Sequence, residues 1–207
     1  MLQRKELSSN SSNYAEMLAT QQPIDKGHDT TVYIDPTNPK QVIKHWHGSS
    51  KDSGRPTQDS LEFSTRMAKE YSKVTSEAQQ RLAKVKEMDF YKEARLNGKP
   101  INISIKSNET IIQSNNVYSR SELVPGLNLS DYYSQNVGNN PPLKTEFMNL
   151  LMSYSSQLYA NLGLPRGGQF DPLNVKVIET NTEVVLIITD LFGNIWEGLS
   201  EMDRLHR

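Results

Sequence analysis

Hydrophobic residues typical of β-strands gather in two short stretches near the N-terminus, with a polar segment between them, and this pattern predicts a β-hairpin. The stretches are Thr31–Ile34 and Gln41–Lys44, and the segment between them reads Asp-Pro-Thr-Asn-Pro. Proline, asparagine and aspartate favour the tight turns that join antiparallel strands. The sequence therefore predicts an antiparallel hairpin whose second strand ends at Lys44.

A long amphipathic helix is expected next, from about Asp59 to Glu87. Apolar residues recur there mostly at helical spacings and so fall on one stripe. The stripe consists of Leu61, Met67, Ala68, Tyr71, Val74, Ala78, Leu82 and Val85. Segments rich in β-formers follow near 93–96, 101–105 and 110–113, and we expect them to complete a small antiparallel sheet.

The second half of the chain begins with an expected edge strand at Tyr118–Leu123. An extended segment then leads into a short helix, for which Asn128 or Ser130 is the expected cap. A second amphipathic helix is predicted from about Lys144 to Asn161, and Gly163 ends it. A β-hairpin and a final helix over about 195–205 close the chain.

Composition narrows the class of protein. The 207 residues suffice for one sizeable core, and 35% of them are hydrophobic. No apolar run approaches the roughly 18 residues that a membrane span requires, so we expect no membrane partner. A formal net charge of -1 gives no electrostatic reason to expect a nucleic-acid partner.

The absence of cysteine excludes disulfides and zinc-thiolate sites, so any metal should be bound by oxygen. Residues 1–22 are rich in serine and asparagine, which indicates a flexible leader. The leader lacks the apolar region of a cleaved Sec-type signal peptide.

The densest candidate chemistry lies near the C-terminus, at the two ends of the predicted hairpin. Asp171 and Asn174 precede one strand, within Phe-Asp-Pro-Leu-Asn, and Asp190 follows the next strand, within Asp-Leu-Phe-Gly. Carboxylate and amide oxygens are the ligands that hold Mg²⁺ against the phosphates of a nucleotide. In the protein-kinase fold the catalytic loop and the Asp-Phe-Gly turn have this task. We therefore predict that Asn174 and Asp190 bind metal.

Upstream residues agree with a nucleotide site in both order and type. Lys44 ends a Val-Ile-Lys strand, as does the lysine that pairs with phosphates in kinases. Gly27 is the one glycine left of a glycine-rich loop that is anchored on Val32. Glu77 is the favoured carboxylate partner of Lys44, and Leu123 begins the expected hinge.

One departure from the kinase pattern concerns the catalytic base. The base aspartate normally stands five residues before the metal-binding asparagine, and Gln169 occupies that position. Glutamine cannot accept a proton. Either Asp171 is the base, which we favour, or the protein binds nucleotide without transferring phosphate.

The element order predicts an α+β fold of the minimal, two-lobed protein-kinase type. The expected domain covers 23–207, with an N-lobe of small antiparallel sheet and long helix over about 23–123. The hinge is expected over about 123–128, and a reduced helical C-lobe, lacking the activation segment, over about 129–207.

With these motifs in this order, the chain resembles the HopBF family of bacterial type III effector kinases. The resemblance implies a Ser/Thr protein kinase that uses ATP and Mg²⁺, with Lys44 on the phosphates and Asp171 at the substrate hydroxyl. It also implies secretion by a type III system into the host cell cytoplasm. The implied substrate is the eukaryotic ninety-kilodalton heat-shock chaperone, which the kinase phosphorylates and inactivates.

Alternative functions remain open from the sequence. Gln169 and the missing glycines also fit a pseudokinase or a nucleotide-binding adaptor. A small-molecule kinase of the antibiotic-phosphotransferase type shares the hairpin but normally builds its substrate site from a larger helical lobe. The non-enzymatic alternative is an adaptor that binds the chaperone without catalysing a reaction. We expect a monomer in each case.

Overall fold

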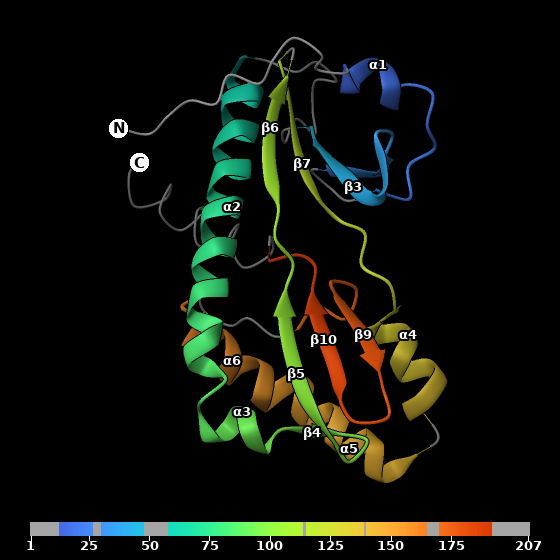
Figure 1. The fold of residues 1–207 in the computed structure, drawn as a ribbon, viewed down its shortest axis with the longest axis vertical. Coiled ribbons are helices and arrows are strands. Elements are labelled where there is room, and N and C mark those ends of the chain that lie inside the picture. The colour runs from blue at the N-terminus through green and yellow to red at the C-terminus, as the bar shows by residue number, and fades with distance from the viewer. Residues whose placement is uncertain are drawn as a thin grey trace. The chain divides into compact units, whose positions relative to one another are not determined.

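The computed structural model describes residues 13–26, 30–47, 58–113, 115–138, 140–164 and 170–191. It confirms the α+β class, because runs of strands that form two five-stranded sheets are followed by runs of helices along the chain (Figure 1). The chain divides into two compact units. The first unit comprises Met1–Ala68 and Glu109–Leu123, and the second comprises Lys69–Asn108 and Val124–Arg207.

The sheet of the first unit is antiparallel throughout, with strand order β1-β2-β3-β7-β6. Its strands are β1 (Asp25–Lys26), β2 (Thr30–Asp35), β3 (Asn38–Trp46), β6 (Glu109–Gln113) and β7 (Asn116–Glu122). Pairing of β2 with β3 confirms the predicted hairpin. The prediction of an edge strand near Tyr118 is wrong, because β7 is paired on both sides. Burial of Val117 and Tyr118 explains this interior position.

A short helix, α1 (Tyr14–Leu18), precedes this sheet and corrects the prediction that structure begins near Pro23. Tyr14 and Leu18, four residues apart and thus on one helix face, are buried in a core cluster with Ile43 and Tyr118. The Asn13 side chain caps the helix by accepting a hydrogen bond from the backbone of Ala15. A capped first turn and two large side chains on one face are sufficient to anchor this segment.

The long amphipathic helix is confirmed as α2 (Gln58–Val85). Its predicted stripe is largely buried, with Met67, Ala68 and Ala78 almost inaccessible to solvent. The division between the two units falls within this helix. A short helix, α3 (Asp89–Glu93), follows and packs against β5 of the second unit.

The second unit has a mixed sheet of order β4-β5-β10-β9-β8. Its strands are β4 (Arg95–Leu96), β5 (Lys99–Ile105), β8 (Leu127–Asn128), β9 (Val175–Glu179) and β10 (Val184–Ile188). The expectation that segments 93–96 and 101–105 join the first, antiparallel sheet is wrong. β5 pairs in parallel with β10, because Ile101, Ile103 and Ile105 are buried beside Val184, Leu186 and Ile188. This pairing also places Lys69–Asn108 in the second unit rather than the first.

The helices of the second unit are α4 (Leu129–Tyr132), η1 (Tyr133–Val137), α5 (Pro141–Asn149), η2 (Leu150–Tyr154) and α6 (Ser155–Leu162), where η marks a π-helical turn. Asn128 caps α4, as expected. The predicted helix over 144–161 is confirmed but starts earlier, because Asn140 caps it. Gly163 ends it with a φ of 70°, as predicted.

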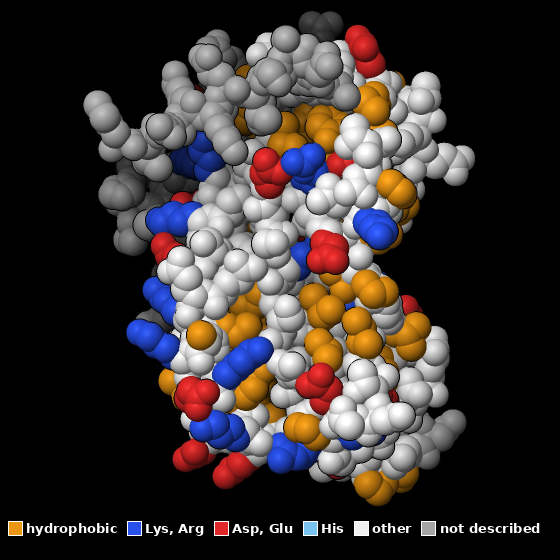
Figure 2. All heavy atoms as spheres, in the orientation of Figure 1, with side chains coloured by type: hydrophobic (Ala, Val, Ile, Leu, Met, Phe, Trp, Pro, Cys, Tyr) orange, Lys and Arg blue, Asp and Glu red, His pale blue; other side chains and the backbone are white. Residues whose placement is uncertain are grey.

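One face of the second sheet is only half-buried. Ile178, Val185 and Ile187 alternate with fully buried neighbours, and Figure 2 shows hydrophobic side chains at the surface of this unit. Gly126 lies close against this sheet, with a φ of 103°, and a Cβ there would meet the Val177 carbonyl oxygen at 2.6 Å. Gly126, in the Pro-Gly sequence of the expected hinge, thus occupies a position where a side chain would clash with the sheet and strain the backbone.

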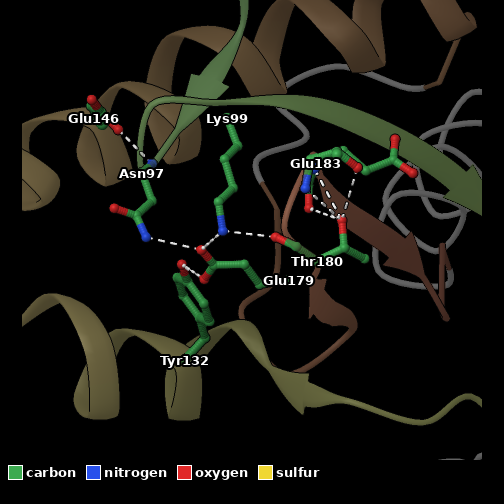
Figure 3. Close-up of polar contacts among 8 residues, drawn as sticks. Asn97, Lys99, Tyr132, Glu146, Glu179, Thr180 and Glu183 are labelled. Carbon is green, nitrogen blue, oxygen red and sulfur yellow. Dashed lines mark hydrogen bonds and ion pairs between the residues drawn. The ribbon is translucent and has the colours of Figure 1, made fainter.

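A polar cluster joins the β4–β5 turn and β5 to β9, α4 and α5 at one end of the second sheet (Figure 3). The Glu179 carboxylate accepts hydrogen bonds from Lys99 at 2.7 Å, Asn97 at 2.9 Å and Tyr132 at 2.8 Å. Glu146 accepts a further bond, from the backbone N–H of Asn97. We call these five residues the Glu179 cluster. Each hydrogen bond in the cluster joins residues more than forty positions apart in the chain, so the cluster fastens distant parts of the unit together.

The final helix expected over 195–205 lies outside the described residues. Within the described part of the chain, no helix combines the length and the apolar character that crossing a bilayer demands.

Candidate functional site

A tight turn ahead of β9 positions Asp171 and Asn174. Asp171 accepts one hydrogen bond from the backbone N–H of Leu173 at 2.9 Å and one from the Asn174 side-chain nitrogen at 3.0 Å. A backbone bond from Asn174 N–H to the Asp171 carbonyl, also 2.9 Å, closes the turn. Because the Asn174 amide nitrogen is engaged by Asp171, its oxygen Oδ1 is the atom that can bind a cation.

Thr189 connects this turn to the end of β10. Its backbone N–H and its hydroxyl both donate to the Asn174 carbonyl oxygen, at 2.8 and 3.0 Å. Asp190 is the next residue along the chain. The two predicted metal-binding residues, Asn174 and Asp190, are therefore joined by one residue and two hydrogen bonds.

Tyr159, on α6, shows that the two carboxylates converge. Its side chain is buried, and its pKa is raised first by burial and then by the negative charges of Asp171 and Asp190. Electrostatic effects of this kind require short distances. Asp171 and Asp190 thus lie near the same phenol, as a shared site requires.

A second buried tyrosine, Tyr71 on α2, contacts the end of β10. Its hydroxyl donates to the Thr189 carbonyl oxygen at 3.3 Å. Its pKa is raised well above the ordinary value, first by burial and then by the charge of Asp190. The sequence places Tyr71 and Tyr159 among helix residues with an apolar stripe, and no local signal distinguishes either from an ordinary core residue.

The donor set of this site fits a hard divalent cation. The Asp190 carboxylate and the Asn174 amide oxygen are of the oxygen-ligand types that Mg²⁺ takes from proteins. No group of three or more His, Cys, Asp or Glu side chains within the described residues could hold a metal ion.

In the first unit, Lys44 and Val32 lie on one face of the sheet. They are directly opposite each other on β3 and β2, and Ser119 of β7 is opposite Lys44 on its other side. The Lys44 ammonium nitrogen is 5.8 Å from the centre of the Trp46 ring. The Trp46 indole N–H donates to the Ser119 hydroxyl at 2.7 Å, which fixes the ring beneath the lysine.

Leu123 follows the last strand of the same unit. Its side chain is exposed, and its backbone N–H donates to the Lys40 carbonyl oxygen at 2.8 Å. Gly27 lies outside the described residues, as do Gln169 and the last two residues of Asp-Leu-Phe-Gly. Of the predicted glycine-rich loop, the structure describes its two flanks, β1 and β2.

Glu77 lies on α2 within the second unit, on an exposed face. Its carboxylate is 4.0 Å from Arg81, four residues further along the helix. The structure thus places Val32, Lys44 and Leu123 in the first unit, and Glu77 and the Asp171 site in the second. Pairing of Lys44 with Glu77 stays a prediction.

Comparisons with known proteins reach only the level of the fold. No protein-family model matches the chain, and no curated protein matches it. Among solved structures, a double mutant of the Mycobacterium tuberculosis PknI kinase domain matches with a TM-score of 0.43 and 11% identity, over 84% of this chain and 57% of that one. The apo form of PpkA-294 matches with a TM-score of 0.41 and 14% identity, over 88% of this chain and 62% of that one.

The chain is thus weakly similar in fold to protein kinase domains and spans less than two thirds of the length of these solved chains. Similarity at this level assigns no family. Any functional conclusion must come from the residues of the site.

Proposed function

We propose that the chain is an ATP- and Mg²⁺-dependent protein kinase that phosphorylates serine or threonine hydroxyls. One observation supports this above the others. The Asp171 turn and Asp190 are joined through the hydrogen bonds of Thr189, and the charges of both carboxylates raise the pKa of the buried Tyr159. In protein kinases an asparagine of the catalytic loop and the aspartate of the Asp-Phe-Gly turn hold the metal ions.

In this proposal Asn174 and Asp190 hold Mg²⁺, which neutralises phosphate charge when it is bound. Asp171 accepts the proton of the substrate hydroxyl, and its exposure leaves the carboxylate accessible for that contact. Lys44 pairs with the nucleotide phosphates, while Gly27, Val32, Glu77 and Leu123 complete the nucleotide site by analogy with kinases.

A second candidate function is a nucleotide-binding protein without phosphotransfer. It is favoured by the bonding of Asp171, since each carboxylate oxygen already accepts a hydrogen bond from its own turn. A carboxylate oxygen has two lone pairs, so these bonds still leave capacity for a substrate hydroxyl. For this reason we favour the active kinase.

The protein substrate is proposed from the motif resemblance alone. It is the eukaryotic ninety-kilodalton heat-shock chaperone, reached after type III secretion into the host cytoplasm, and the kinase acts as a monomer.

Transfer of radiolabelled phosphate from ATP tests the proposal. The purified chain should label itself, a generic basic protein or the purified chaperone, and Asp190→Ala should abolish labelling while its circular dichroism stays that of the wild type. Phosphotransfer by Asp190→Ala at unchanged Mg²⁺ would refute the assignment. Nucleotide binding by the wild type without labelling of any protein would establish the second candidate instead.

A further inference from the structure

Both peptide planes of Thr189 are held by hydrogen bonds to other segments. On its N-terminal side, its N–H donates to the Asn174 carbonyl oxygen, and its hydroxyl reinforces that bond. On its C-terminal side, its carbonyl accepts from the Tyr71 hydroxyl. Because the carbonyl of Thr189 and the N–H of Asp190 belong to one rigid peptide plane, fixing the first orients the second.

The Tyr71 hydroxyl is well placed to act as this anchor. Tyr71 is only 4% exposed, and it stands near the middle of the long helix α2. The Asp190 side chain, the Asn108 side chain and the backbone of Leu191 also lie within hydrogen-bonding reach of the phenol. Asn108 is held against α2 by Ser72 of that helix, whose hydroxyl donates to the Asn108 side-chain oxygen at 2.7 Å. The phenol is thus part of a network that links one helix to the residues on both sides of Asp190.

We propose that Tyr71 is a positioning residue for the metal site: through Thr189, and through its own contact with Asp190, it sets the spacing between Asn174 Oδ1 and the Asp190 carboxylate. Mg²⁺ demands near-ideal octahedral geometry, so small errors in that spacing weaken its binding. Tyr71 itself touches neither the metal nor the substrate. This inference rests on the proposed function, because it assigns a role at the same metal site.

The test compares Tyr71→Phe with Tyr91→Phe as a matched control. Tyr91 is also buried, lies in the same unit, and its hydroxyl accepts the backbone N–H of Ile103 at 2.7 Å. Each variant therefore loses one buried hydroxyl and keeps its ring. Only Tyr71 contacts the Asp190 segment.

Isothermal titration of Mg²⁺ into the purified chain saturated with ADP gives the apparent Mg²⁺ affinity. Loss of one positioning hydrogen bond should weaken that affinity by about fivefold to tenfold in Tyr71→Phe, with less than about a twofold change in Tyr91→Phe. ADP binding measured in EDTA should be equal in both variants. The Mg²⁺ concentration that gives half-maximal phosphotransfer should rise in parallel.

Thr189→Val serves as a second variant if Tyr71→Phe does not fold. It removes the hydroxyl that donates to Asn174 but keeps the backbone bonds, and it should weaken Mg²⁺ binding in the same direction. Equal Mg²⁺ affinities in Tyr71→Phe, Thr189→Val and Tyr91→Phe would overturn the inference and leave the proposed function intact. A wild-type chain that binds neither ADP nor Mg²⁺ would overturn both.

Discussion

Each end of the β9–β10 hairpin carries an acidic side chain, but the two carboxylates have different hydrogen-bond partners. At one end, Glu179 meets a lysine at 2.7 Å and two further donors, Asn97 and Tyr132 (Figure 3). At the other end, Asp171 accepts hydrogen bonds from two neutral groups, both in its own turn. The charge of a second carboxylate, Asp190, raises the pKa of the buried Tyr159, as the charge of Asp171 also does.

This difference separates a structural carboxylate from a candidate catalytic one. Burial alone would raise the pKa of Glu179, but hydrogen bonds from Lys99, Tyr132 and Asn97 outweigh it and lower that pKa. The charge of Glu179 is thus satisfied within the protein. Asp171 is exposed and accepts hydrogen bonds from neutral groups of its own turn, so its carboxylate stays accessible to a substrate or a cation. The comparison predicts that variants at the two ends fail in different ways.

The largest expected effect is on the rate of phosphotransfer. Asp171→Asn keeps the size of the side chain but removes the proposed base, so kcat should fall by about a hundredfold to ten-thousandfold, with ATP affinity unchanged. Glu179→Gln, at the other end of the same hairpin, should keep its kcat per folded molecule. Steady-state kinetics of both variants measure this contrast. Equal losses of kcat would show that the two ends do not divide their roles as proposed.

Much of the fold follows from local patterns in the sequence. The stripe of α2, the β2–β3 hairpin and the Asn128 cap are all local features, and the structure confirms each of them. The pairing of β5 with β10 is not local. Ile101, Ile103 and Ile105 alternate in a way that suits either sheet, and their partners lie some eighty residues away.

The candidate site was likewise predictable only in part. Asp171, Asn174 and Asp190 carry metal-binding chemistry in their residue types and stand at hairpin ends, which are visible in the sequence. Tyr71 and Tyr159 are not visible in this way, because an aromatic residue in an amphipathic helix usually belongs to the core. Only coordinates show that each tyrosine lies close enough to Asp190 for the charge of that carboxylate to raise the pKa of the phenol.

A smaller effect concerns stability at the structural end. Glu179→Gln leaves the Lys99 ammonium without its counter-charge and should cost about 1–2 kcal/mol, or roughly 3–6 °C in Tm, at neutral pH. The folded pKa of Glu179 lies below its ordinary value of 4.5, so its contribution is present above that value and is lost as pH falls through the folded pKa. Thermal melts at several pH values should show the wild type and Glu179→Gln converging in acid. A constant difference down to the lowest pH would contradict this reading.

The smallest expected effect separates two tyrosines of the second unit. The Tyr132 hydroxyl donates to Glu179, whereas the buried Tyr154 hydroxyl has no hydrogen-bond partner among the residues that the structure describes. Leaving a buried hydroxyl unpaired costs folding free energy, so Tyr154→Phe should leave Tm unchanged or raise it by about 2 °C, while Tyr132→Phe should lower it by about as much. Both changes keep the aromatic ring, including the contact of Tyr154 with Phe90 at 5.8 Å. A loss of Tm in Tyr154→Phe equal to that in Tyr132→Phe would mean that the Tyr154 hydroxyl is bonded in solution, and burial without a partner would no longer distinguish the two residues.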